Sequence, residues 1–259
     1  MKVVVLAGGM GMRLREETEY RPKPLVEIGG RPILWHIMKH YAHYGFKEFV
    51  VALGYRGWMI KEYFLNYDAM NSDFTVRLGD KPEVKYHDSH PEQDYRVTLA
   101  ETGLNSQTGG RVKRLQRHIG DDDTFLLTYG DGLADVDLRA VLDFHKKHGK
   151  LATVTGVRVA SRFGILNVAE DGQVQSFVEK PLLGEWSSAG FFVLNRRVFD
   201  YLSGDDSIFE RDAMQRLAAD DQLACYQHTG CFYTMDTYRE YISLNEAWDA
   251  GKAPWKVWK

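Results

Sequence analysis

Short apolar runs recur along the first part of the chain, and glycines close them. They cover residues 3–6, 49–53 and 125–129. Unbroken apolar runs of this length are typical of strands that are buried on both faces of a sheet. A further strand is predicted for residues 151–156. The chain is therefore expected to place at least four strands in one sheet.

Between these runs, apolar positions recur with the spacing of a helix. The clearest case starts after Pro32 and ends near Gly45, and proline in a first turn with glycine just past the last turn is the usual pattern at helix ends. Helices are also predicted for residues 60–67, 112–119 and 138–148. This alternation predicts an α/β fold with a mostly parallel sheet and helices on both faces.

Two regions depart from this rhythm. Residues 71–105 are polar and irregular, and they are expected to form an excursion from the sheet. Residues 164–168, 174–178 and 190–194 form short apolar stretches with turns between them, which predicts a mixed-sheet extension over the carboxyl ends of the parallel strands. No linker rich in Ser, Gly or Pro separates the halves. Residues 1–259 are thus expected to form one domain, divided near residue 156.

Composition narrows the function classes. With 259 residues, 44% of them hydrophobic, the chain can bury a large core. The formal net charge of −3 gives no reason to expect a nucleic acid or a membrane surface as a partner. No apolar stretch approaches the roughly 20 residues of a membrane span, and two cysteines suit a reducing compartment. A cytoplasmic protein is expected.

The first chemical signal is a glycine-rich loop directly after the first strand. Successive glycines expose backbone N–H groups that can cradle an anion. An arginine in the loop, and a lysine between two prolines further on, add cations suited to phosphate. The triphosphate of a nucleotide is the expected ligand. The candidate phosphate-binding residues are Leu6, Ala7, Gly8, Gly9, Gly11, Arg13 and Lys23.

Other phosphate-binding loops do not match this sequence. The G-x-x-x-x-G-K-[ST] motif is absent from it. A dinucleotide fingerprint would need a third glycine where Leu14 stands, and its ribose-binding acid should close the second strand, which instead closes at Leu53 and Gly54. An enzyme that uses NAD is therefore disfavoured.

Two carboxylates are candidates for a metal site. Asp131 follows the apolar strand at residues 125–129, at the edge where parallel sheets bind ligands. A carboxylate there can hold a hard cation such as Mg²⁺ beside phosphates. Asp236 can complete the site if the fold brings it close. Taken alone, an aspartate between glycines more often caps a turn.

A third candidate follows the strand at residues 174–178, where Glu179 and Lys180 precede a proline. The lysine can neutralise a sugar phosphate, and the glutamate can accept hydrogen bonds from sugar hydroxyls. On its own, a charged exit turn is the simpler explanation. By contrast, His36 and His40 lie four residues apart on a predicted helix without a third ligand, so surface histidines are expected there, not a metal pair.

Taken in order, these motifs resemble the family of sugar-1-phosphate nucleotidyltransferases, which make nucleotide sugars. The resemblance spans nearly the whole chain. It rests on Leu-Ala-Gly-Gly-x-Gly-x-Arg-Leu at residues 6–14, Lys23-Pro24, Gly130-Asp131, Arg162-Phe163-Gly164, Glu179-Lys180-Pro181 and Ala189-Gly190-Phe191-Phe192. Within the family, the segments most similar to the branch that joins CTP to glucose 1-phosphate are residues 32–38, 108–111, 129–132, 235–237 and 251–256.

The resemblance implies a Rossmann-like α/β fold and transfer of a nucleotidyl group from CTP to a sugar 1-phosphate, with release of pyrophosphate. Residues 1–156 would bind the nucleotide, and residues 157–259 the sugar phosphate. The resemblance also implies a homo-oligomer and a requirement for Mg²⁺. The implied catalytic residues are Arg13, Lys23 and Asp131, and the implied metal ligands are Asp131 and Asp236.

Further contacts follow from the same resemblance. Ser106 and Arg111 would help to fix the base or the ribose of the nucleotide. The sugar phosphate would be bound by Gly164, Glu179, Lys180 and Ser188.

Two positions depart from the family pattern. Met12 stands where the family usually has Thr, which removes one hydroxyl contact to phosphate. Ser188 stands where it usually has a sugar-binding Asn, so the identity of the sugar stays open. The same reaction with another sugar 1-phosphate, or with dTTP, UTP or GTP, is the nearest alternative. A catalytically silent nucleotide-sensing homologue is more distant, and a nucleic-acid-binding module, indicated only by the basic residues 111–117, is more distant still.

Overall fold

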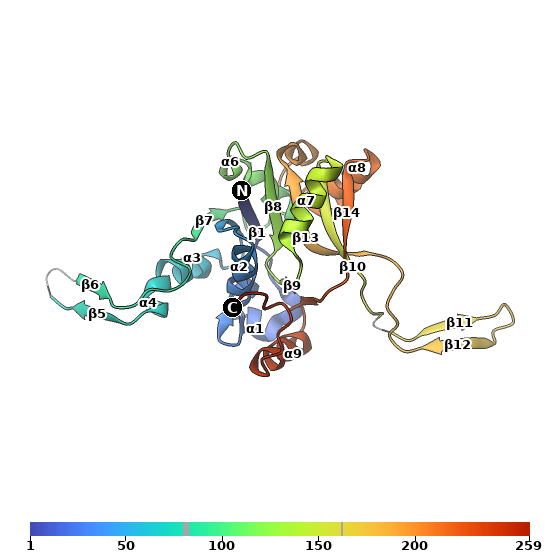
Figure 1. Ribbon diagram of the computed structural model, residues 1–259, viewed down its shortest axis with the longest axis horizontal. Helices are drawn as coiled ribbons and strands as arrows, with labels where there is room; N and C mark the ends of the chain where they lie inside the picture. Colours follow the sequence, from blue (N-terminus) through green and yellow to red (C-terminus); the bar gives the residue numbers. More distant parts are fainter. Residues whose placement is uncertain (80–82, 162) are drawn as a thin grey trace.

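A seven-stranded sheet forms the centre of the protein (Figure 1). The structure, a computed structural model, describes residues 1–79, 83–161 and 163–259. The order across the sheet is β14-β10-β13-β8-β1-β4-β7. Its strands are β1 (Lys2–Leu6), β4 (Glu48–Leu53), β7 (Arg96–Glu101), β8 (Thr124–Tyr129), β10 (Ala152–Val157), β13 (Ser187–Asn195) and β14 (Leu223–His228).

Neighbouring strands are parallel except at β13, which runs antiparallel to both β8 and β10. The predicted mostly parallel sheet is therefore confirmed. The expected place of residues 190–194 is wrong, because they belong to β13 inside this sheet. Residues 71–105 are not only an excursion, since they contain the edge strand β7. Its alternation of polar and apolar residues differs from the apolar runs of the inner strands.

Alternate strand residues pack into two cores, one on each face of the sheet. On one face, Val3 and Val5 belong to a core that includes α2 (Ile33–His43) and α7 (Leu138–His148). On the other, Val4 belongs to a core with α5, α6 and α8. Helices on both faces are thus confirmed. The helix predicted for residues 112–119 is two short ones, and the bounds are α5 (Thr108–Arg114), α6 (Gln116–Ile119) and α8 (Gln215–Ala219).

The remaining elements surround the sheet. In the described part of the chain, no helix is long and apolar enough to cross a membrane. The other α-helices are α1 (Arg15–Thr18), α3 (Gly57–Leu65), α4 (Tyr67–Asn71) and α9 (Tyr238–Asp249). Turns of 3₁₀ helix cover Met12–Leu14, Lys23–Leu25 and Arg196–Tyr201, and a π-helix covers Phe209–Met214. Two short ladders pair β2 (Glu27–Ile28) with β3 (Arg31–Pro32) and β9 (Gly132–Ala134) with β15 (Phe232–Thr234).

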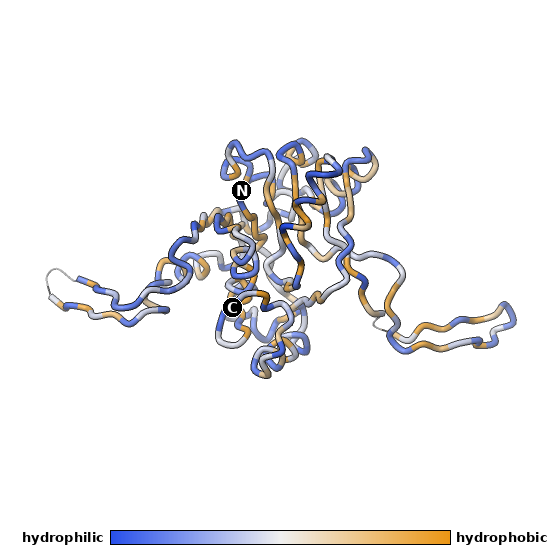
Figure 2. The backbone as a smooth tube through the Cα atoms, viewed as in Figure 1, coloured by the Kyte–Doolittle hydropathy of each residue, from blue (hydrophilic) through white to orange (hydrophobic). Residues whose placement is uncertain are grey.

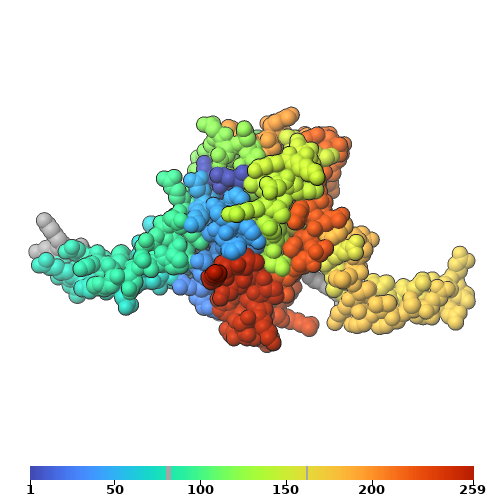
Figure 3. Space-filling view, in the orientation of Figure 1, coloured from blue at the N-terminus to red at the C-terminus, as the bar shows by residue number. Residues whose placement is uncertain are grey.

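Two hairpins stand out from opposite sides of the body, as Figure 1 and the space-filling view in Figure 3 show. One pairs β5 (Phe74–Arg77) with β6 (Glu83–Tyr86), and the other pairs β11 (Ile165–Val168) with β12 (Val174–Val178). Hydrophobic residues recur along both hairpins in Figure 2, and Phe177 is 60% exposed. Within the part of the chain that the structure describes, β11 and β12 pair with each other and with no other strand, so they do not join β13 in the extension that the sequence predicted.

His36 and His40 of α2 are buried, so the expectation that these two histidines lie on the helix surface is wrong. His36 and His40 are 0% and 3% exposed. His36 lies edge-on to the ring of Trp248 and near Trp255 and Trp258. The last part of the chain therefore covers this face of α2, and periodicity within α2 carries no information about that contact.

Candidate nucleotide site

A cavity of about 640 Å³ lies at the carboxyl ends of β1 and β8. These strands are neighbours in the sheet, so the loops that follow them lie together. Open α/β sheets bind ligands in this position. Residues 6–13, 104–108 and 129–131 line the cavity, together with Lys23, Pro24 and Arg111. The lining includes every predicted nucleotide-binding residue: Leu6, Ala7, Gly8, Gly9, Gly11, Arg13, Lys23, Ser106, Arg111 and Asp131.

The glycine loop after β1 is held in shape by Thr18. Gly11 has φ +63°, and a Cβ atom there would lie 2.8 Å from the Thr18 methyl carbon. A side chain at Gly11 would therefore meet both backbone strain and a collision. The Thr18 hydroxyl donates to the carbonyl oxygens of Gly11 and Leu14, at 3.0 and 2.9 Å. Met12 is 78% exposed, so the loop does not depend on packing of that side chain.

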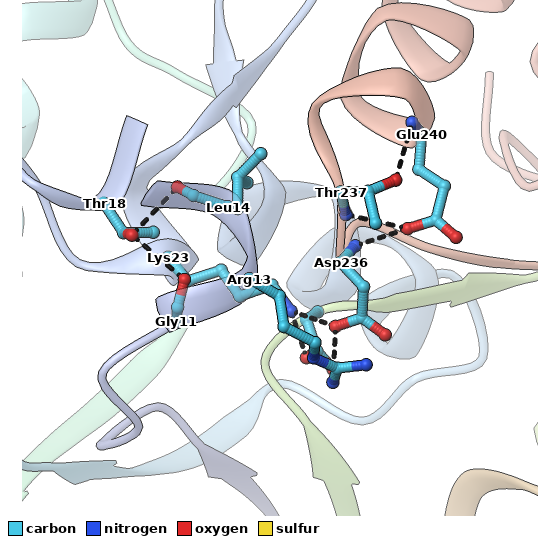
Figure 4. A network of polar contacts seen from close by, with 9 residues as sticks. Gly11, Arg13, Leu14, Thr18, Lys23, Asp236, Thr237 and Glu240 are labelled. Carbon is cyan, nitrogen blue, oxygen red and sulfur yellow. Dashed lines mark hydrogen bonds and ion pairs between the residues drawn. The ribbon is translucent and has the colours of Figure 1, made fainter. Parts of the chain in front are cut away.

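Two cations and two carboxylates meet beside this loop, and Figure 4 labels three of these residues, Arg13, Lys23 and Asp236. The Lys23 ammonium lies 2.6 Å from Asp131 Oδ2 and 2.6 Å from Asp236 Oδ1. The Arg13 guanidinium lies 3.0 Å from Asp236 Oδ1. The partners of Lys23 are 108 and 213 residues away in sequence. The fold thus brings together the four charged residues that the sequence singled out for phosphate and metal binding.

The two carboxylates suit a hard divalent cation. Both already converge on one ammonium group, so both oxygens can reach a single cation in that region. Within the described residues, no group of three or more His, Cys, Asp and Glu side chains is placed to hold a metal. Mg²⁺ is commonly held by one or two carboxylates together with substrate phosphates and water. Asp131 and Asp236 fit that pattern when a nucleotide supplies the remaining oxygens.

Asp236 is positioned by the start of α9. The Thr237 hydroxyl accepts from the Glu240 backbone N–H, and the Glu240 carboxylate accepts from the backbone N–H of Thr237 and of Asp236, at 2.9 and 2.8 Å. This capping box satisfies the first free N–H groups of the helix. Because the cap fixes the backbone at Asp236, it also fixes where the carboxylate meets Lys23 and Arg13. The spacing Thr-x-x-Glu can be read from the sequence.

The contacts of Arg111 in this structure are with other residues of the protein, a role that the sequence did not predict. Its guanidinium donates to the carbonyl oxygens of Leu53, Gly103 and Leu104 and to the Thr102 hydroxyl, over 2.7–3.2 Å. Burial lowers the pKa of Arg111. The side chain therefore ties together the loops after β4 and β7 behind the cavity. Contact of Arg111 or Ser106 with a base or ribose stays a prediction.

The predicted sugar-phosphate residues lie outside this cavity. Glu179 and Lys180 follow β12, their charged groups are 3.5 Å apart, and both side chains are mostly exposed. Gly164 precedes β11, and Ser188 lies in β13, where its hydroxyl accepts from the Gly190 N–H at 3.3 Å. Arg162, part of the motif around Gly164, lies outside the described residues. The sugar site therefore stays a prediction.

Two residues near the cavity were not predicted from the sequence. Thr18 shapes the glycine loop, and Glu210 bonds to Tyr129 and Thr108, which both line the cavity. Neither lies in a recognisable motif. Their roles depend on which segments the fold places side by side.

The fold and the cavity define a nucleotide-binding protein of the α/β class, and sequence comparison gives its family. A profile of the nucleotidyl transferase family matches residues 2–251. The chain belongs to this family, and the predicted resemblance is confirmed.

Similarity to particular members extends over the full length. The chain is 48% identical to glucose-1-phosphate cytidylyltransferase from Salmonella typhi over 260 aligned residues, which cover 100% of both chains. It is 44% identical to a probable glucose-1-phosphate cytidylyltransferase from Bacillus subtilis over 259 residues, again 100% of both. A solved structure, a putative glucose-1-phosphate thymidylyltransferase from Bacillus anthracis, superposes with a TM-score of 0.72 at 18% identity, over 100% of this chain and 98% of that one. That likeness concerns the Rossmann-like fold alone.

Proposed function

We propose that this protein transfers the cytidylyl group of CTP to α-D-glucose 1-phosphate, giving CDP-glucose and pyrophosphate. The full-length identity of 48% to a glucose-1-phosphate cytidylyltransferase carries the proposal. The cavity supports it, because the glycine loop and the charged cluster of Arg13, Lys23, Asp131 and Asp236 suit a triphosphate beside a divalent cation.

The proposed chemistry is in-line attack of a sugar-phosphate oxygen on the α-phosphorus of CTP. Such a reaction depends on positioning and charge neutralisation more than on covalent help from the protein. The N–H groups of the glycine loop and the side chains of Arg13 and Lys23 hold the triphosphate and offset charge on the departing pyrophosphate. We propose Mg²⁺, held by Asp131 and Asp236, as the cation that neutralises phosphate oxygens.

The test is a pyrophosphate-release panel that crosses CTP, UTP, dTTP, GTP and ATP with several sugar 1-phosphates. CTP with glucose 1-phosphate should give the highest kcat/KM. A much higher value with another nucleotide refutes the cytidylyl assignment and leaves the reaction class standing. A higher value with another sugar, for which Ser188 in place of the usual Asn gives a reason, changes only the acceptor. No release with any pair favours the silent nucleotide-sensing homologue.

We also propose that the protein acts as a homo-oligomer. The two exposed hairpins support this, since both carry several exposed hydrophobic residues, and exposed apolar surface commonly marks an interaction site. Light scattering coupled to size-exclusion chromatography should give a multiple of the chain mass. A monomer across micromolar concentrations contradicts the proposal.

A further inference from the structure

One carboxylate organises the part of the cavity wall that contains Thr108 and Tyr129. Glu210 Oε1 accepts a hydrogen bond from the Tyr129 hydroxyl, and Glu210 Oε2 accepts one from the Thr108 hydroxyl at 2.8 Å. Tyr129 and Thr108 both line the cavity. Burial, followed by the charge of Glu210, raises the pKa of Tyr129, so its hydroxyl keeps its hydrogen at neutral pH.

The helix that carries Glu210 is locally unusual. Glu210 lies in the π-helix Phe209–Met214, a rare form that is frequent at functional sites. The backbone N–H of Phe209 donates to the Thr108 hydroxyl oxygen at 2.9 Å. Thr108 is therefore held by two successive residues of this helix.

The same region clamps the start of α5. The backbone N–H of Gln107 donates to Asp205 O at 2.8 Å, and that of Gly110 donates to Ser207 O at 3.0 Å. A Cβ atom at Gly110 would lie 2.6 Å from the Asp205 backbone, so the two segments can approach this closely only with glycine there. The backbone that carries Glu210 is consequently held in place against α5, and the two hydrogen bonds of Glu210 set the orientation of the Tyr129 and Thr108 hydroxyls.

A hydroxyl that donates its hydrogen to a carboxylate can offer a ligand only lone pairs. One lone pair of Thr108 is used by the Phe209 N–H, and Tyr129 keeps its own. The wall thereby presents hydrogen-bond acceptors, which suit a ligand that presents an N–H donor. Cytosine carries an amino group at the position where uracil carries a carbonyl oxygen, an acceptor that this wall would repel.

We propose that Glu210 is a positioning residue for nucleotide choice: it fixes the Tyr129 and Thr108 hydroxyls as acceptors and so favours a base that bears an amino group. This inference rests on the proposed function. It assigns the base to the wall formed by Thr108 and Tyr129, while the triphosphate lies on the glycine loop.

The test compares kcat/KM for CTP and for UTP, at saturating glucose 1-phosphate, in the wild type and in Glu210→Gln. An amide can donate as well as accept, so it releases the hydroxyls to either orientation. A hydrogen bond to a charged group commonly changes binding by roughly 10-fold or more. We expect kcat/KM for CTP to fall about 10-fold, the CTP-to-UTP ratio to narrow by a similar factor, and KM for glucose 1-phosphate to stay within about 2-fold.

Two further variants separate positioning from simple support. Tyr129→Phe removes one acceptor and should also narrow the ratio. Asp206→Asn makes the same change of acid to amide at an exposed position nearby, and it should leave the ratio as in the wild type. Thermal unfolding of each variant shows whether it is folded.

A merely structural role for Glu210 would lower the activity with both nucleotides equally, so an unchanged ratio in folded Glu210→Gln overturns this inference alone. A wild type that uses UTP as well as CTP overturns the proposed nucleotide, and this inference with it.

Discussion

Replacement of Lys23 by methionine tests the charged cluster directly. Methionine keeps the length and apolar stem of the side chain while removing the ammonium that lies 2.6 Å from both Asp131 and Asp236. The Lys23 side chain is 11% exposed, Asp236 is 13% exposed and Asp131 is 31% exposed. Among the described residues, the variant therefore leaves two partly buried carboxylates near one another, with Arg13 as their remaining ion-pair partner.

The size of the effect follows from this burial. Removing one partner of a fully buried ion pair costs about 3–5 kcal/mol, and solvent screening at Asp131 reduces the loss. We expect unfolding to become easier by about 2–3 kcal/mol. For a chain of this size, that corresponds to a fall in Tm of roughly 5–10 °C.

Thermal unfolding with and without Mg²⁺ gives a readout that does not depend on activity. In the wild type the Lys23 ammonium and the Arg13 guanidinium together balance the charge of the two carboxylates, so Mg²⁺ alone should raise Tm little. In Lys23→Met a cation can replace the lost charge, and ligand binding to the folded state raises Tm. Several degrees of recovery are expected at millimolar Mg²⁺.

Lys39→Met is the matched control, because Lys39 also pairs with a buried carboxylate, Glu92 at 2.9 Å, but outside the cavity. It should lose stability without recovery by Mg²⁺. Equal Tm values for Lys23→Met and wild type, or equal Mg²⁺ responses in the two methionine variants, would refute the claim that Lys23 balances a cation-binding acid pair.

Three further outcomes are expected. Asp236→Asn should lower Mg²⁺-dependent turnover at least ~10-fold, while Tm changes by a few degrees at most. The control Asp249→Asn, at the end of α9, should keep full activity, and full activity in Asp236→Asn would remove Asp236 from the metal site. Arg13→Ala should weaken CTP binding at least ~10-fold in calorimetric titrations without sugar phosphate. Lys180→Ala should instead raise KM for the sugar phosphate. If both variants lose CTP affinity equally, Lys180 does not belong to the sugar site, which then lies elsewhere. Burial lowers the pKa of His36 to about 4, below its ordinary value near 6.5. The unfolded chain therefore takes up the proton first, and the free energy of unfolding falls by up to about 3 kcal/mol as the pH falls from about 6.5 towards 4. Urea unfolding of His36→Gln should show a smaller loss over this range, and an equal loss would mean that other groups cause it.

The central sheet could be predicted from sequence where strands are buried on both faces. The run at residues 3–6 is apolar throughout and the run at residues 125–129 is mostly apolar, because their side chains enter both cores. Strand β7 could not be found in the same way, since it lies at the sheet edge and alternates polar with apolar residues. Strand β13 was predicted as a strand but assigned to the wrong sheet, because its two neighbours in the sheet come from elsewhere in the chain.

The residues of the candidate site likewise fall into those that a local sequence pattern predicts and those that depend on the fold. Gly11, Arg13, Lys23 and Asp131 stand in local patterns whose chemistry can be read directly, and the cavity contains all of them. Asp236 could be named only as a second acid that needs the fold to bring it close. Its contact with Lys23 spans 213 residues, and no local pattern encodes such a distance.

The division near residue 156 is therefore not a division of the site. The glycine loop, Lys23 and Asp131 come from the first part of the chain, but Asp236 reaches the same cluster from the cap of α9. Glu210, also from the second part, bonds to two residues of the cavity wall. Strand β13 runs beside β8 and presents Gly190 against the ring of Tyr129, where a Cβ atom would lie 2.3 Å from a ring carbon. The second part of the chain thus shapes the nucleotide cavity itself, and a change there can alter nucleotide binding without touching the glycine loop.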